Sequence, residues 1–164
     1  MLSCDNLAGN GRLLAAAARE FAAQLDPGLA AWIEAEVAFP CTMVDSITPA
    51  TTPALVQRVT TELGMEDRWP VQRESFVQWV VEEHEAPESP DWARAGVTLT
   101  DDVSGYERAK LRLLNGAHST LAYVGILRGH ETVADAMRDT ALSAFVRDLM
   151  HKDVAPTLRP VRGL

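Results

Sequence analysis

Polar side chains with acid–base or hydrogen-bonding chemistry occur at helical spacing around the segment KLRLLNGAHS. Glu107 lies three residues before Lys110, whereas Asn115 and His118 lie five and eight residues after it. On an α-helix, which turns about 100° per residue, His118 comes about 80° and Glu107 about 60° from Lys110. Leucines fall among these side chains, so the pattern predicts that Lys110 lies on a buried face, which is an unusual place for a lysine.

Two interpretations of this face are open from the residues. Burial of an ammonium group lowers its pKa toward neutrality, where proton transfer is efficient, so Lys110 is a candidate general base or acid. Asn115 offers a neutral amide that can stabilise a developing alkoxide, and His118 can hydrogen-bond a substrate hydroxyl. The structural alternative is a snorkelling lysine beside a satisfied core histidine and a helix-surface asparagine.

The elements that must position these residues are mostly helices. Apolar spacing and capping residues predict helices over residues 12–25, 27–39, 54–64, 103–127, 131–139 and 142–155. The β-branched stretch 41–48 is expected to be extended, whereas 76–83 could form a strand or a short helix. A loop is expected over 84–92 and a tail over 156–164. The predicted class is therefore mainly α with a minor β component.

Composition narrows the possible functions. A chain of 164 residues with a net charge of −8 has room for one domain, and it lacks the basic footprint that binding to nucleic acid needs. No apolar run approaches the ~20 residues of a membrane span, and no secretory signal is visible. The two cysteines form no CxxC pair, so a reduced, cytoplasmic location is expected. No HExxH pattern is present, and we expect no metal site.

The lysine segment also carries a resemblance. KLRLLNGAHS resembles the catalytic motif of the polyol-specific long-chain dehydrogenases, the mannitol dehydrogenase and fructuronate (mannonate) oxidoreductase family. Further counterparts follow one another in family order and cover essentially the whole chain: SCDN from Ser3, NG at Asn10, FPCTMVDSITPAT from Phe39 and ESFVQWVVE from Glu74.

The resemblance implies an NAD- or NADP-dependent, metal-free oxidation of a polyol to the ketose, of the mannitol-to-fructose type. The fructuronate/mannonate branch, which acts on a sugar acid, is the alternative. By analogy Lys110 is the general base, and Asn6 and Asn115 are the paired donors around the reacting oxygen. His118 orients the substrate. Asp45 binds a sugar hydroxyl, and Glu107 lies on the proton path from Lys110 to water.

The resemblance also implies a domain organisation. Family members begin with a Rossmann-type domain, but Gly9-x-Gly11 has no third glycine of the dinucleotide fingerprint. We therefore expect the chain to lack the Rossmann domain, with residues 1–8 as a remnant of its end. Residues 9–164 are then a helical C-terminal domain of the 6-phosphogluconate dehydrogenase C-terminal-like type, truncated at its C-terminus.

This organisation would place the cofactor-binding residues outside the chain. Catalysis would then require a separate nucleotide-binding chain. An alternative from another class is a truncated helical domain that has no activity of its own.

Overall fold

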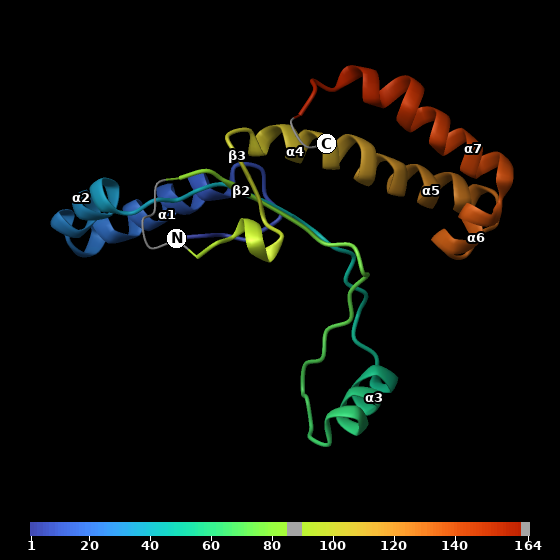
Figure 1. Ribbon diagram of the computed structural model, residues 1–164, viewed down its shortest axis with the longest axis horizontal. Helices are drawn as coiled ribbons and strands as arrows, with labels where there is room; N and C mark the ends of the chain where they lie inside the picture. The colour runs from blue at the N-terminus through green and yellow to red at the C-terminus, as the bar shows by residue number, and fades with distance from the viewer. Residues whose placement is uncertain (85–89, 162–164) are drawn as a thin grey trace. The chain divides into compact units, whose positions relative to one another are not determined.

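The computed structural model describes residues 1–84 and 90–161, and its contacts divide the chain into two units, Met1–Leu99 and Thr100–Leu164. In the described part of the first unit lie α1 (Asn10–Leu25), α2 (Pro27–Glu36), β1 (Thr42–Asp45), α3 (Pro53–Leu63), β2 (Gln78–Glu82) and the 3-10 turn η1 (Ala93–Ala95). The short strand β3 (Thr98–Thr100) begins in the first unit and ends at the first residue of the second. The second unit contains α4 (Val103–Ala109), the π-helical turn η2 (Lys110–Asn115), α5 (Gly116–Leu127), α6 (Val133–Arg138), α7 (Thr140–Asp148), the π-helical turn η3 (Leu149–Val154) and the 3-10 turn η4 (Ala155–Thr157). Figure 1 shows these elements in chain order.

The alanine-rich helix α1 and the following α2 form a hairpin. Asp26 separates them, and its carboxylate accepts a hydrogen bond from the Gly28 N–H at 2.7 Å, which caps α2. The chain then returns close to the start of α1. A Cβ on Gly11 would lie 2.4 Å from the Phe39 carbonyl oxygen, so only glycine allows this close approach.

The small sheet follows the hairpin in the chain. β1 and β2 pair antiparallel, with Thr42 opposite Val81 and Asp45 opposite Gln78, and β3 lies on the other side of β2. Beyond β1 and β2 the two segments stay paired. Ile47 N–H donates to Glu74 Oε1 at 2.7 Å, and Glu74 N–H donates to the Ile47 carbonyl at 3.1 Å. These paired segments connect the sheet to α3 (Figure 1).

The sheet supplies part of the buried core of the first unit. Met43, Val80 and Val81 are buried. Trp79 of β2 packs edge to face on Trp92, with ring centroids 5.3 Å apart and ring planes at 80°. This aromatic contact fixes the segment before η1 against the sheet.

The second unit is a helical hairpin. α4, η2 and α5 follow one another without a break, and α7 with η3 returns beside them (Figure 1). Ala117 and Leu121 of α5 form a buried cluster with Leu142 and Val146 of α7. This cluster is the core that holds the long helix in place.

Asp139 joins the two arms of this hairpin. Its carboxylate accepts hydrogen bonds from the N–H groups of Ala141 and Leu142 at the start of α7, both at 3.1 Å. It also lies 2.7 Å from Arg128 Nε and 3.1 Å from His130 Nε2. These donors, the Leu142 N–H first and then His130, lower the pKa of Asp139 to about 2.

Most predicted elements are confirmed. Every predicted helix has a counterpart, Asp26 is the cap of α2, and Gly64 ends α3 with a positive φ of 68°. The segment 76–83 contains a strand rather than a helix. The predicted loop over 84–92 lies partly outside the described residues. The predicted tail is in part structured, because η4 begins it and Val161 packs against α4.

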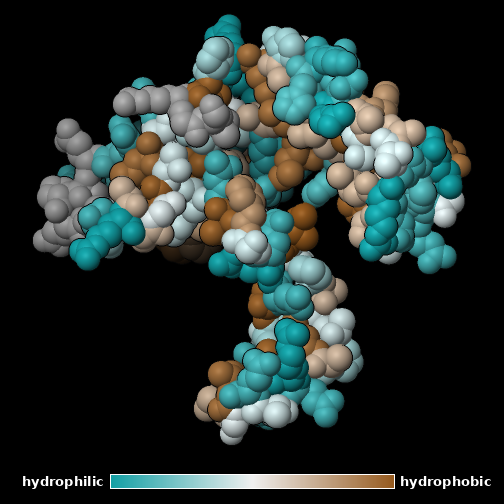
Figure 2. Space-filling model, turned by 45° about the vertical axis from the view of Figure 1, so that its right-hand side comes forward, coloured by the Kyte–Doolittle hydropathy of each residue, from teal (hydrophilic) through white to brown (hydrophobic). Residues whose placement is uncertain are grey.

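The two units differ in charge. Residues 1–99 contain six basic and fifteen acidic side chains, a net charge of −9, whereas residues 100–164 contain nine basic and eight acidic ones, a net charge of +1. Large apolar side chains remain exposed in both units, as the brown areas of Figure 2 show. Within residues 1–84 and 90–161, no helix is both long and apolar enough to cross a membrane.

Candidate active site

Lys110 stands at the first position of a π-helical turn. α4 ends one residue before it, and η2 spans Lys110–Asn115 before α5 resumes the regular helix. The backbone N–H of Gly116 reaches the carbonyl of Leu111, five residues back, which is the hydrogen bond of a π-helix. Such turns are rare and occur frequently at functional sites.

The π turn changes which side chains share a face. On a regular α-helix Asn115 would lie about 140° from Lys110. A π turn contains more residues than an α-helical turn, so Asn115 comes closer to the side of the helix that carries Lys110. His118 is three residues after Asn115, and Glu107 is three residues before Lys110, so each lies about 60° from its neighbour. The four candidate residues on this helix therefore share one side.

The burial of the four candidate side chains indicates that they lie at the border between the core of the second unit and the solvent. Lys110, Asn115, His118 and Glu107 are all half-buried, as a reacting group that must meet both substrate and water requires. Buried residues flank them at Tyr106, Ala109, Ala117 and Leu121.

One detail of the predicted face is different. Leu111, which the regular helix placed among the polar group, is 63% exposed. It lies inside the π turn, where each residue advances by a smaller angle than in an α-helix.

The other two candidates belong to the first unit. Asn6 is exposed and lies in the turn before α1. Asp45 is half-buried and ends β1, opposite Gln78. The pairing of Asn6 with Asn115 around a substrate oxygen, and the contact of Asp45 with a sugar hydroxyl, stay predictions.

A buried asparagine, for which the sequence predicted no role in the site, positions the Asn6 segment. Asn10 is 2% exposed, and its Nδ2 donates to the Asp5 carbonyl at 3.0 Å and to Thr42 Oγ1 at 2.9 Å. Its Oδ1 accepts from the Thr42 N–H at 2.9 Å. The network ties the turn that carries Asn6 to the start of β1, the strand that ends in Asp45. The Asn10-Gly11 pair at the start of α1 is the sequence feature from which this network could have been predicted.

The donor set of the helix is one of nitrogen bases and amides. In the part of the chain that the structure describes, His, Cys, Asp and Glu side chains nowhere gather in a group of three that could hold a metal ion. Lys110 offers a base, whereas Asn115 and His118 offer hydrogen bonds to an oxygen. This set provides for the proton and the oxygen of an alcohol, and none of its side chains can accept a hydride.

Comparison with protein families decides the relationship. The model of the mannitol dehydrogenase Rossmann domain matches residues 1–94, and that of the mannitol dehydrogenase C-terminal domain matches residues 102–163. The chain belongs to the mannitol dehydrogenase family. The resemblance inferred from the lysine motif is therefore confirmed.

Individual members of the mannitol dehydrogenase family are similar along the whole chain. D-mannonate oxidoreductase of Escherichia coli (strain K12) is 44% identical over 163 residues, which are 99% of this chain and 34% of that protein. The crystal structure of D-sorbitol dehydrogenase in its substrate-free form superposes with a TM-score of 0.91 at 39% identity, over 99% of this chain and 34% of the other. The ternary complex of Pseudomonas fluorescens mannitol 2-dehydrogenase with NAD and D-mannitol gives a TM-score of 0.77 at 45% identity, over 99% and 33%.

The chain spans about a third of the length of the relatives it matches. The boundary between the two family models, after residue 94, is close to the boundary between the two structural units, after Leu99. The domain boundary expected at residue 8 stays a prediction.

The expectation that the chain lacks the Rossmann domain is wrong, because the family model of that domain matches residues 1–94. The expectation rested on the missing glycine fingerprint, which marks only the first βα turn of such a domain. Other parts of the domain need no such glycines. In this segment Gly9 is the N-cap of α1, and Gly11 accommodates the backbone of Phe39. The need for a separate nucleotide-binding chain followed from that expectation, and no comparison supports it.

Proposed function

We propose that this chain carries the reaction centre for the NAD- or NADP-dependent, metal-free oxidation of a polyol or a sugar acid to the corresponding ketose. The observation that carries the proposal is the π turn, which brings Asn115 toward the same half-buried side of the helix as Lys110. Support comes from the mannitol dehydrogenase family and from a relative whose structure contains NAD and D-mannitol.

Lys110 acts on the proton of the alcohol. Its neutral amine accepts the hydroxyl proton as the C–O bond becomes a carbonyl, and Glu107, on the same side of the helix, passes that proton to water. In the reverse direction the ammonium form of Lys110 donates a proton to the ketone oxygen. A half-buried amine at the edge of an apolar core is well placed for this transfer, because it can meet both the substrate and water.

Asn115 and Asn6 stabilise the oxygen while it carries negative charge. A neutral amide donor does this without a net charge of its own, so it binds neither the alcohol nor the product too tightly. His118 and Asp45 hydrogen-bond the remaining hydroxyls and orient the carbon chain.

NAD(P), when bound, supplies the hydride acceptor that this donor set lacks. The alcohol then loses one proton to Lys110 and one hydride from its carbinol carbon, which leaves the ketone. The side chains of the helix can take up the proton and hydrogen-bond the oxygen, which leaves the hydride to the cofactor.

The deciding experiment compares the chain's two lysines in the full-length gene product. Lys110→Ala is expected to lower kcat by about 10²–10⁴-fold, because a general base is lost, while circular dichroism stays unchanged. Lys152→Ala is the matched control, since Lys152 is exposed and pairs with Asp148 at 2.8 Å. Rescue of Lys110→Ala by added methylamine would support the amine's role. Near-normal turnover of Lys110→Ala would refute the proposal.

The substrate class needs its own measurement. D-mannitol, D-sorbitol and D-mannonate, the last with a carboxylate, are compared by kcat/KM with NAD and with NADP. Preference for the carboxylate would place the protein in the mannonate branch, and preference for the neutral polyols would place it in the mannitol branch. The cytoplasm is the compartment we propose, because Cys4 and Cys41 are both free thiols.

A further inference from the structure

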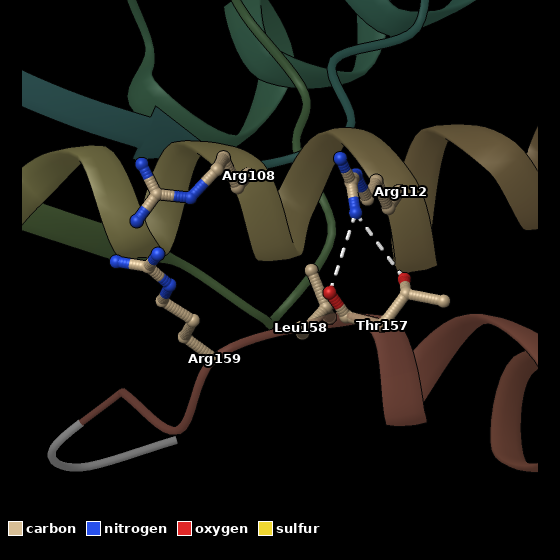
Figure 3. A pocket seen from close by; sticks show the side chains of 5 residues that line it. All are labelled: Arg108, Arg112, Thr157, Leu158 and Arg159. Carbon is tan, nitrogen blue, oxygen red and sulfur yellow. Dashed lines mark hydrogen bonds between the residues drawn. The ribbon is translucent and has the colours of Figure 1, made fainter.

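Three arginines line one pocket in the second unit. Arg108 of α4 and Arg112 of η2 are one helical turn apart, and Arg159 comes from the extended segment after η4. Thr157 and Leu158 complete the lining of a cavity of about 340 Å³. Figure 3 shows the guanidinium groups of Arg108 and Arg159 pointing toward one another.

The positive charge of this pocket is only partly balanced. Asp102 Oδ1 lies 3.9 Å from Arg108 Nη2, but the same atom also accepts hydrogen bonds from the Ser104 hydroxyl and the Gly105 N–H. Neither Arg112 nor Arg159 has a carboxylate within ion-pair distance among the described residues, although Asp102 also attracts Arg159 electrostatically. Two guanidinium groups that face each other repel unless an anion lies between them.

The pocket is built by the fold. Arg112 Nη1 donates to Thr157 Oγ1 at 3.2 Å and to the Thr157 carbonyl at 3.5 Å (Figure 3), which joins η2 to the end of η4. Next to this contact the chain lies directly on α4. A Cβ on Gly105 would come within 2.8 Å of Val161 Cγ2. The close approach at Gly105 therefore holds the segment that carries Arg159.

The pocket lies on the other side of the long helix from the proposed reaction centre. Arg108 lies about 160° from Lys110 on an α-helix. Both Arg108 and Arg112 are exposed, whereas Lys110 is half-buried. The pocket is therefore separate from the face that handles the alcohol, and its interpretation does not rest on the proposed function.

We propose that Arg108, Arg112 and Arg159 form a binding site for the phosphate group of a small molecule. Guanidinium groups match phosphate oxygens in paired hydrogen bonds, and a dianion neutralises two facing arginines where a carboxylate neutralises one. The net charge of +1 on the second unit, against −9 on the first, favours an anion here despite the acidity of the whole chain.

Isothermal titration of the full chain with inorganic phosphate tests the site, with chloride and acetate at equal ionic strength as comparisons. We expect saturable binding of phosphate and none of chloride or acetate. Glycerol phosphate is the second arm. Tighter binding of this ester than of inorganic phosphate would identify a phosphorylated metabolite as the source, and the opposite order would identify free phosphate.

Three variants separate the pocket from general charge effects. Arg159 lies outside any helix, so Arg159→Gln changes no helical residue. This variant is expected to weaken phosphate binding at least about tenfold. Arg108→Lys keeps the charge but loses the planar fork, so it should weaken binding as well. Arg138→Gln is the matched control, because this exposed helical arginine pairs with Asp135 at 2.6 Å outside the pocket. Equal effects of Arg159→Gln and Arg138→Gln, or equal binding of acetate and phosphate, would overturn the site.

Discussion

Lys110 and Asn115 stand at the two ends of a single π turn, and the geometry of that turn decides which side chains share a face of the helix with Lys110. A regular helix would direct the amide well away from the amine. The wider turn returns it to the same side, next to His118 and Glu107. The chemistry assigned to this face therefore depends on one extra residue in one turn of backbone.

At His118 the proposal makes a prediction about substrate binding. His118→Ala removes a hydrogen bond to a substrate hydroxyl and is expected to raise KM for the polyol by about 2- to 10-fold, with little change in the affinity for NAD(P)H. Steady-state kinetics measure KM for the polyol, and a fluorescence titration measures the affinity for NAD(P)H. His151→Ala, at an exposed position of η3, is the control. An unchanged KM for the polyol counts against the role of His118.

At the scale of elements, close approach of backbones fixes the start of the first unit. Gly11→Ala places a Cβ 2.4 Å from the Phe39 carbonyl and is expected to lower the free energy of unfolding by about 1–3 kcal/mol. In Gly116→Ala the new Cβ meets only the Leu111 carbonyl, at 3.9 Å. This control should be neutral or stabilising by up to about 1 kcal/mol. Urea unfolding of both variants measures the difference, and equal stabilities would contradict the packing role of Gly11.

Asp139 gives the second unit a dependence on pH. Its pKa in the folded chain is about 2, below its ordinary value of 3.8. The stabilisation is therefore complete above pH 3.8 and disappears as the pH falls toward 2.

Asp139→Asn removes this charge from the bonds with Arg128 and His130. We expect the melting temperature of the second unit to fall by several degrees at pH 7 and to vary less between pH 4 and pH 2. Asp153→Asn removes the same charge from an exposed position and should leave the pH profile unchanged. A wild-type profile in Asp139→Asn would contradict the assignment.

Local patterns in the sequence predicted the helices and their ends. Features that depend on contacts between distant residues could not be predicted in this way. Apolar spacing located the helices, and Asp26 and Gly64 marked their ends because a cap acts on its own helix. A constant 100° per residue could not reveal the π turn. The contact between Arg112 and Thr157, which are 45 residues apart, has no local pattern. The Rossmann segment was misassigned because its best-known motif marks a different part of that domain.

For the whole molecule, the aromatic residues make the two units separately observable. All four tryptophans, at positions 32, 69, 79 and 92, lie in the first unit, and both tyrosines, Tyr106 and Tyr123, lie in the second. Tyr106 is 2% exposed and senses the core of its unit.

We expect Gly11→Ala to shift the unfolding transition seen by tryptophan fluorescence and Asp139→Asn to shift that seen by tyrosine absorbance. Each variant should leave the other signal nearly unchanged, because each unit buries side chains of its own. Denaturant titrations with both probes measure this. Coincident transitions that move together in both variants would show instead that the chain unfolds as one cooperative body.

The edge-to-face pair of Trp79 and Trp92 has a spectroscopic consequence. Two indole rings 5.3 Å apart and inclined at 80° have transition dipoles close enough to couple, and in a chiral setting such coupling splits one absorption band into two circular dichroism bands of opposite sign. One ring is on β2 and the other precedes η1, so the couplet exists only while these segments remain together. The couplet therefore reports whether the native sheet is intact, and replacing either tryptophan with phenylalanine is expected to abolish it.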